Sequence, residues 1–166
     1  MAGAHSVEAT TKRVIVGRLL PGTDLIRGLE SVCDSHQVMY AAVVFAYGSL
    51  SSAAFKTLQI APGSSRPALA LRRLERRVEF LGGQGLVCRD DTGARATHLH
   101  GCVSDETGQV LGGHFEPGLN PVFNNMDFTL YELTGVDLIR RWDADTETVE
   151  MVVQQSEQTT PSEESS

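Results

Sequence analysis

The sequence predicts a single α+β domain built on a largely antiparallel β-sheet with a few helices. Its 166 residues suit about one domain, and 41% hydrophobic with 21% charged residues is ordinary globular usage. One segment has clear helical periodicity, and most of the others resemble short strands with turn residues between them. The gaps between these strands are too short for the helices that parallel βαβ units need, so antiparallel pairing is favoured.

The N-terminal part predicts a strand followed by a helix. Residues 12–20 form the strand, and Pro21 and Gly22 break it. Thr23 is the expected helix N-cap. The apolar residues that follow recur at helical spacing and predict one buried face: Leu25, Ile26, Leu29, Val32 and Cys33.

The rest of the chain predicts mainly strands. Residues 38–47 are continuously apolar and end at Gly48, which fits a central strand buried on both faces. Residues 68–77 are a candidate second short helix. The other strand candidates cover residues 54–60, 78–81, 84–89, 95–103, 109–115, 125–133 and 148–153.

Composition sets the expected boundaries and location. Residues 1–12 and 154–166 are polar and predict disordered tails, the second one acidic, around a body at 13–153. The net charge of −7 argues against a protein devoted to binding phosphate backbones. The longest apolar run is about half of a membrane span, and the first residues lack a secretory signal, so we expect a cytoplasmic protein that does not enter membranes.

Several chemistries lack their usual signatures. The cysteines are Cys33, Cys88 and Cys102, an odd number without a CxxC pair, which disfavours a disulfide framework or a cysteine zinc site and predicts reduced core residues. The sequence contains no Walker loop, no GxSxG elbow and no GxGxxG between a strand and a helix.

The chemistry-bearing residues lie in a glycine-rich window that contains three of the five histidines. Side chains alternate across a strand, so His98, His100 and Cys102 share one face of their strand. The next residues, 105–108, read Asp-Glu-Thr-Gly, which is typical of a type I turn with a glycine bulge. If this turn pairs residues 105 and 109, His100 lies directly opposite His114, and His98 lies diagonal to it.

Three neutral imidazoles at this spacing suit zinc or a related metal ion and leave one coordination position for water or a small ligand. The alternative is three unrelated polar residues on a solvated strand face. Cys102 is a possible fourth ligand or a core cysteine. Three carboxylates on other strands are candidate proton acceptors for a metal-bound water or, alternatively, solvent-facing residues: Glu79, Asp127 and Glu132.

Four segments together resemble the plant and prokaryote conserved (PPC) domain across about 13–153. They are GRLLPGTDLIRGLE, the apolar strand ending in YGSL, VEFLGGQG and HLHGCVSDETGQVLGGHF. The resemblance implies a single α+β domain of the stand-alone prokaryotic kind and assembly as a homotrimer. It also implies a bound metal, with zinc as the expected ion, on the positions that match the family's ligands, His98, His100 and His114. Plant relatives lack this full histidine set.

The resemblance also raises the question of DNA binding. Stand-alone members are often named as predicted DNA-binding proteins, a name taken over from plant relatives that carry AT-hooks. This sequence has no Arg-Gly-Arg-Pro core. It has one basic cluster, read as a solvated face, a subunit contact or a phosphate-binding patch: Arg66, Arg72, Arg73, Arg76 and Arg77.

Three functions follow from these observations. The favoured one is a metal-binding homotrimer of unassigned role that takes a small ligand at the open coordination position. The alternatives are a DNA-binding transcriptional regulator and a zinc-dependent hydrolase or lyase.

Overall fold

A computed structural model describes residues 3–60 and 67–156, which form eleven strands and one helix. The elements are β1 (Thr10–Leu19), α1 (Leu25–Ser35), β2 (Tyr40–Leu50), β3 (Ala53–Ile60), β4 (Pro67–Leu74), β5 (Val78–Val87), β6 (Arg89–Asp90), β7 (His98–Ser104), β8 (Val110–Phe115), β9 (Val122–Thr134), β10 (Val136–Asp143) and β11 (Thr148–Gln155).

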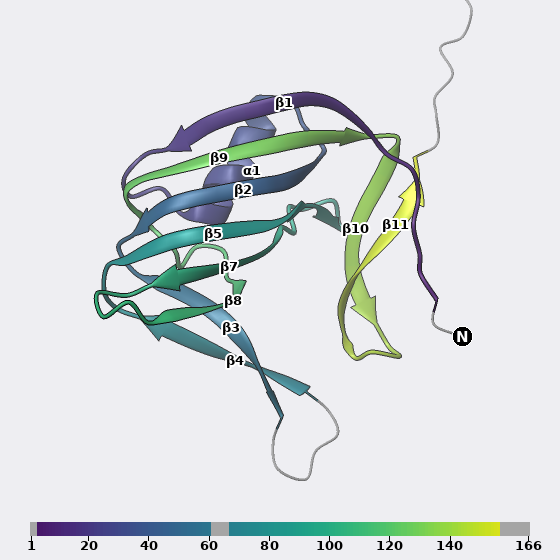
Figure 1. Cartoon of the computed structure of the whole chain (residues 1–166). Helices are drawn as coiled ribbons and strands as arrows, with labels where there is room; N and C mark the ends of the chain where they lie inside the picture. Colours follow the sequence, from purple (N-terminus) through teal and green to yellow (C-terminus); the bar gives the residue numbers. More distant parts are fainter. Residues whose placement is uncertain (1–2, 61–66, 157–166) are drawn as a thin grey trace, which may run out of the picture.

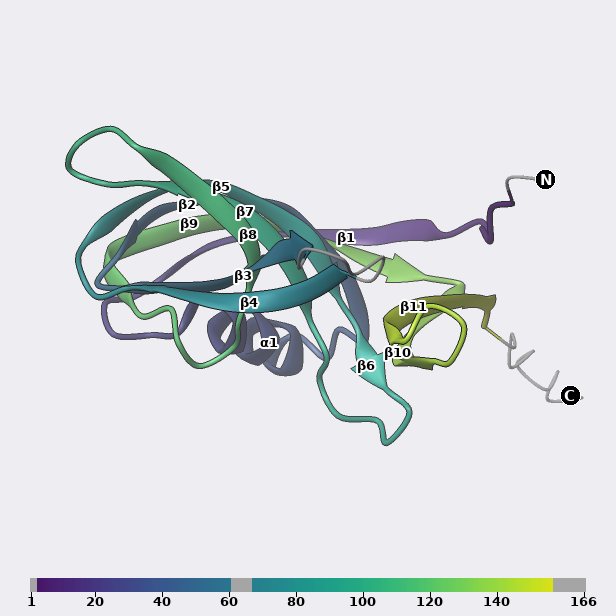
Figure 2. The ribbon, with the colours of Figure 1, turned by 90° about the horizontal axis from the view of Figure 1, so that it is seen from below.

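Eight strands form one antiparallel sheet in the order β1-β9-β2-β5-β7-β8-β3-β4 (Figure 1). The other three form a small sheet in the order β11-β10-β6. The large sheet is curved, and α1 lies against one of its faces (Figure 2). The predicted, largely antiparallel sheet is therefore confirmed, whereas the described residues contain one helix and not the few that were expected.

Helix α1 buries the face that its periodicity predicted, including Leu25, Ile26 and Leu29. Its N-cap is Asp24, so the expectation of Thr23 is wrong. One Asp24 carboxylate oxygen accepts from the backbone N–H of Arg27 at 3.0 Å, and the other accepts from the backbone N–H of Asn120 at 2.8 Å. The Asp24 carboxylate thus caps the helix and also holds the loop before β9. The hydroxyl of Thr23 does not make these two contacts here.

Strand β2 lies centrally between β9 and β5, as predicted. The expectation that it is buried on both faces is wrong. Ala41, Val43 and Ala46 are buried, but Phe45 and Tyr47 remain 40% and 49% exposed. The only helix in the described residues packs against one face of the sheet, so this part of the opposite face has no covering layer.

The second helix predicted at 68–77 is also wrong, because this segment contains strand β4. It pairs with β3 over its whole length, with Thr57 opposite Ala70 and Ala53 opposite Leu74. Pairing with a neighbouring strand supplies partners for the backbone groups, and this tertiary arrangement overrides a weak local helical preference. The two strand candidates at 78–81 and 84–89 are one strand, β5, which continues to Val87 through an irregularity between Phe80 and Gly82.

Strand β10 was not predicted. The chain leaves β9 through Gly135, whose φ of +75° favours glycine, and enters a hairpin of β10 and β11. Val136 and Leu138 pack with Tyr40 and Cys88 in a small second core that attaches this hairpin to the main body. The strand ends extend past the expected body, since β1 begins at Thr10 and β11 ends at Gln155.

All three cysteines are free, as predicted, but Cys102 is half-buried and is not a core residue. Cys33 and Cys88 are buried, and burial raises the pKa of each thiol to about 11. Within residues 3–60 and 67–156, no helix is both long and apolar enough to cross a bilayer.

Candidate metal centre

The turn between β7 and β8 has the predicted form. The N–H of Asp105 donates to the carbonyl of Gln109 at 3.1 Å, and the N–H of Gly108 donates back to the carbonyl of Asp105 at 2.9 Å. Gly108 has φ +79°, the left-handed conformation that a glycine bulge requires. The Asp105 carboxylate accepts from the N–H groups of Thr107 and Gln109, which further fixes the turn.

This turn sets the register that brings the histidines together. His100 pairs directly with His114, and His98 lies two residues before His100 on the same face. Ring centroids of the three pairs lie 4.7 to 5.2 Å apart. One nitrogen from each ring can be chosen so that all three lie within 4.8 Å of one another, and Nε2 of His98 and His100 are 2.9 Å apart.

The opposite face of the same strands anchors the cluster in the core. Leu99 and Val103 of β7 and Phe115 of β8 are fully buried, so the histidines next to Leu99 and Phe115 in the sequence point to the other side. Gly113 permits a close approach of β3, because a Cβ there would lie 2.2 Å from the carbonyl oxygen of Lys56. This approach places Lys56 opposite His114 in register.

Two of the three imidazoles are held neutral. Burial lowers the pKa of His98 to about 4, and the positive charge of Arg140 adds to this effect. Burial likewise lowers the pKa of His114 to about 4, although the Glu116 carboxylate works in the opposite direction. Both rings therefore keep a free nitrogen lone pair at neutral pH, which is the form that ligates metals.

The donor set fits a metal ion. Tetrahedral zinc with imidazole bonds of 2.0–2.1 Å requires nitrogen atoms about 3.3 Å apart, so modest ring rotations would close the set around an ion. Cys102 does not join the cluster: its Sγ lies 4.0 Å from the carbonyl oxygen of Gly82, and it pairs with Gly112, two positions along β8 from His114.

The three carboxylates suggested by the sequence lie elsewhere. Glu132 is buried in ion pairs with Arg13 and Lys12 on β1. Glu79 lines a different cavity, near the β7–β8 turn, and Asp127 lies on β9 opposite Arg18. None of them lines the two cavities that open onto the histidines.

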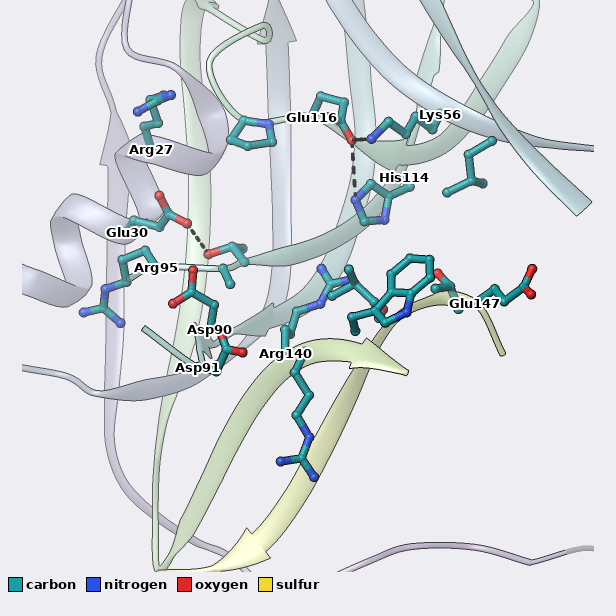
Figure 3. A pocket seen from close by; sticks show the side chains of 18 residues that line it. Arg27, Glu30, Lys56, Asp90, Asp91, Arg95, His114, Glu116, Arg140 and Glu147 are labelled. Carbon is teal, nitrogen blue, oxygen red and sulfur yellow. Dashed lines mark hydrogen bonds and ion pairs between the residues drawn. The ribbon is translucent and has the colours of Figure 1, made fainter. Parts of the chain in front are cut away.

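Three charged residues near the cluster were not predicted: Lys56, Glu116 and Arg140. Nε2 of His114 lies 3.6 Å from Glu116, whose carboxylate is 2.9 Å from Nζ of Lys56 (Figure 3). Strand alternation from His114 would have placed Glu116 on the histidine face. The other two come from β3 and β10, whose positions relative to β8 are not visible in local sequence.

The histidines open into the space between the large sheet and the β10–β11 hairpin. A cavity of about 490 Å³ is lined by all three histidines together with Lys56 and Arg140. A second cavity of about 740 Å³ meets it at His114 and Arg140 and extends toward the start of α1 and the β6 turn. Volumes in this range suit small-molecule ligands.

Comparison with known proteins adds a family and a fold. The family model described as the Plants and Prokaryotes Conserved (PCC) domain matches residues 6–134. A bifunctional protein GlmU of Synechococcus sp. (strain JA-3-3Ab) is 31% identical over 149 residues, which cover 90% of this chain. The alignment spans only 22% of that relative's length.

Solved structures share the architecture. A metal-containing protein of Archaeoglobus fulgidus superposes with a TM-score of 0.76 at 22% identity and covers 90% of this chain and 99% of its own. A plant- and prokaryote-conserved protein of Pyrococcus horikoshii gives 0.73 at 20% identity, covering 88% and 96%. A candidate DNA-binding protein of Ralstonia eutropha gives 0.68 at 20% identity, covering 82% and 89%.

Proposed function

The chain belongs to the Plants and Prokaryotes Conserved domain family, and from this premise we propose that it is a metal-binding homotrimer whose ligands are His98, His100 and His114. The observation that carries the proposal is the convergence of three imidazoles from two strands, with one nitrogen of each within 4.8 Å of the others. Zinc is the favoured ion because three neutral imidazoles suit it. The fourth position of a tetrahedral ion is left for water or a small ligand.

Two further observations support a metal. Burial and Arg140 hold two of the rings in the neutral form that metals bind. The Archaeoglobus fulgidus protein with the same fold is named as metal-containing. A cluster of three imidazoles, two of them half-buried, gains little from being held together without an ion, whereas binding of an ion to the folded protein stabilises it.

The trimer has a surface available to it on the uncovered face of the large sheet. We name this surface the outer apolar face, and its exposed members on β1, β9 and β2 are Val14, Val16, Tyr131, Phe45 and Tyr47. Val14 lies opposite Tyr131, while Val16 and Phe45 flank Thr129 from either side. The rings of Phe45 and Tyr47 stack at 5.7 Å. A contiguous exposed apolar patch of this kind is typical of a protein–protein contact.

Elemental analysis of the purified protein tests the metal directly. Wild type is expected to hold close to one equivalent of zinc per chain after dialysis, and His114→Ala is expected to lose it. His5→Ala, which changes an exposed histidine ahead of β1, is the matched control and should retain the metal. Equal metal content in wild type and His114→Ala, or none in wild type after zinc reconstitution, would contradict the proposal.

DNA binding is the second candidate, favoured by the name of the Ralstonia eutropha neighbour. The described arginines of the basic cluster give it weak support. Arg76 forms an ion pair with Asp105 at 2.6 Å, and Arg77 stacks over Phe123 at 4.1 Å. Arg72 and Arg73 point to opposite sides of β4, and Arg66 lies outside the described residues.

A gel shift across a salt series tests this candidate, since phosphate contacts release counterions and weaken as salt rises. Binding that falls steeply with salt and is reduced in an Arg72→Gln, Arg73→Gln double variant would support it. Absence of a shift at low salt with the assembled protein would remove it.

A further inference from the structure

Arg140 reaches from β10 into the space beside His114 (Figure 3), and it borders a cavity that all three histidines line. It follows Val136 and Leu138 at two-residue steps, and these two are buried against the main body, so alternation turns Arg140 to the same side. Arg140 lines both the 490 Å³ and the 740 Å³ cavities. Of the three histidines, His114 also lines both cavities. Arg141, the next residue, is exposed and borders the 740 Å³ cavity but not the 490 Å³ one.

The Arg140 guanidinium is poorly satisfied. One Nη2 hydrogen bond goes to the carbonyl of Val149 at 3.2 Å, while Nε is shielded from solvent and has no hydrogen-bond partner. In the described part of the chain no carboxylate lies within ion-pair distance of this guanidinium. A half-buried guanidinium with one backbone hydrogen bond and no ion pair is costly unless a ligand supplies further partners.

The charged side chains near Arg140 are either engaged in ion pairs with other residues or exposed to solvent. Glu116 is engaged by Lys56 at 2.9 Å, and Arg95 is engaged by Asp34 at 2.6 Å. Glu150, which lines the smaller cavity, is a solvent-exposed residue of β11. A divalent ion on the histidines would add two positive charges beside Arg140, which has Glu116 and Glu150 nearby but no ion-pair partner among the described residues.

We propose that this cavity binds a small molecule carrying a carboxylate, with the carboxylate on the Arg140 guanidinium and a second oxygen of the same molecule turned toward the three histidines. This inference rests on the proposed metal site, because the second oxygen would take the open coordination position. The planar guanidinium carries paired N–H donors that match two carboxylate oxygens, which a lysine ammonium does not. The smaller cavity, at about 490 Å³, has the size for such a ligand.

The test uses the assembled protein loaded with Co²⁺, whose visible spectrum reports a change at the ion. Metal content is measured first. Oxalate, malonate and succinate then serve as probes of different length, with acetate and the neutral malonamide as controls, and affinities are measured by calorimetry. At least one dicarboxylate is expected to bind more tightly than acetate and to shift the Co²⁺ spectrum, whereas malonamide is not.

Variants assign the effect to the guanidinium. Arg140→Gln is expected to weaken the best dicarboxylate at least tenfold with metal content unchanged, and Arg140→Lys should fall between it and wild type because it keeps the charge without the fork. Arg141→Gln is the matched control and should bind like wild type. Thermal melting of each variant checks that it is folded.

The outcomes separate this inference from the proposed function. Full metal content with equal dicarboxylate affinity in wild type and Arg140→Gln would overturn the carboxylate site and leave the metal site standing. The carboxylate site would equally be overturned if no dicarboxylate binds metal-loaded wild type, or if inorganic phosphate alone binds in an Arg140-dependent way. Failure of wild type to hold any metal would instead defeat the proposed function, and the ligand inference with it.

Discussion

His100 and His114 face each other directly across the β7–β8 hairpin, and the turn that opposes them is held by the carboxylate of Asp105. A shift of one residue in this register would move His114 to the core side and replace it with Gly113. The candidate metal centre thus depends on the geometry of a turn as much as on the histidines themselves.

Removing the Asp105 charge is expected to destabilise the protein at neutral pH. The pKa of this carboxyl lies below its ordinary value, chiefly because the Thr107 side chain donates a hydrogen bond to it. Hydrogen bonds from the backbone N–H groups of Thr107 and Gln109 and the charge of Arg76 act in the same direction. When folding lowers the pKa of a carboxyl, its charge stabilises the folded state at every pH above the pKa of the unfolded state. This stabilisation is lost as the pH falls through the pKa of the folded state. The loss in Asp105→Asn should therefore be full at pH 7 and shrink below about pH 4.

Urea denaturation from pH 7 to pH 3 measures this difference. Glu106→Gln, an exposed change in the same turn, is the control and should leave the midpoint nearly unchanged. A deficit in Asp105→Asn that stayed constant over the whole pH range would show that the charge is not what matters.

Gly113→Ala tests whether β3 must approach β8 closely at this position, as distinct from the general preference of strands for residues other than glycine. The new Cβ would lie 2.2 Å from the carbonyl oxygen of Lys56, so the strands must move apart. We expect a loss of about 1–3 kcal/mol in unfolding free energy and weaker metal binding. Gly82→Ala is the matched control, since a Cβ there meets nothing within 4 Å, and it should unfold like wild type. Equal stability of the two variants would argue against a required close approach.

The convergence of the three histidines was largely predictable because its determinants are local. Two histidines lie on one strand at a spacing of two residues, and a turn of recognisable composition fixes where the third one falls. Periodicity likewise identified the buried face of α1, and a continuous apolar run identified the central position of β2. In each case the deciding residues lie close together in the sequence.

The remaining features depend on pairings that are distant in sequence. Strand β4 was mistaken for a helix because its identity comes from pairing with β3. Strand β10 was missed because Arg140 and Arg141 interrupt its apolar pattern, although Val136, Leu138 and Arg140 alternate to one side. The missed strand at Arg140 is informative. A charged residue at an inward position breaks the apolar pattern of β10 at the place where we propose that a ligand binds.

Assembly is expected to depend on the outer apolar face. Tyr47→Asp would place a carboxylate on the stacked Phe45–Tyr47 pair and opposite Asp127, so it should dissociate the proposed trimer into monomers. Light scattering coupled to gel filtration measures the mass. Val110→Asp changes another exposed apolar residue, 56% accessible at the start of β8, and should leave the mass unchanged. A trimer that persists in Tyr47→Asp would place the subunit contact on another surface.

Metal removal is expected to lower thermal stability without unfolding the domain at room temperature. The core beneath the histidines is continuous and apolar, with Phe80, Leu99 and Phe115 fully buried, so the fold does not depend on an ion. An ion that binds only the folded state stabilises it by about 2.7 kcal/mol at a free concentration of 100 times its Kd. For a chain of this size this corresponds to roughly 5–10 °C in Tm. Calorimetric melting with zinc and with EDTA should show this difference in wild type and not in His114→Ala, and an equal shift in both proteins would mean that zinc acts elsewhere.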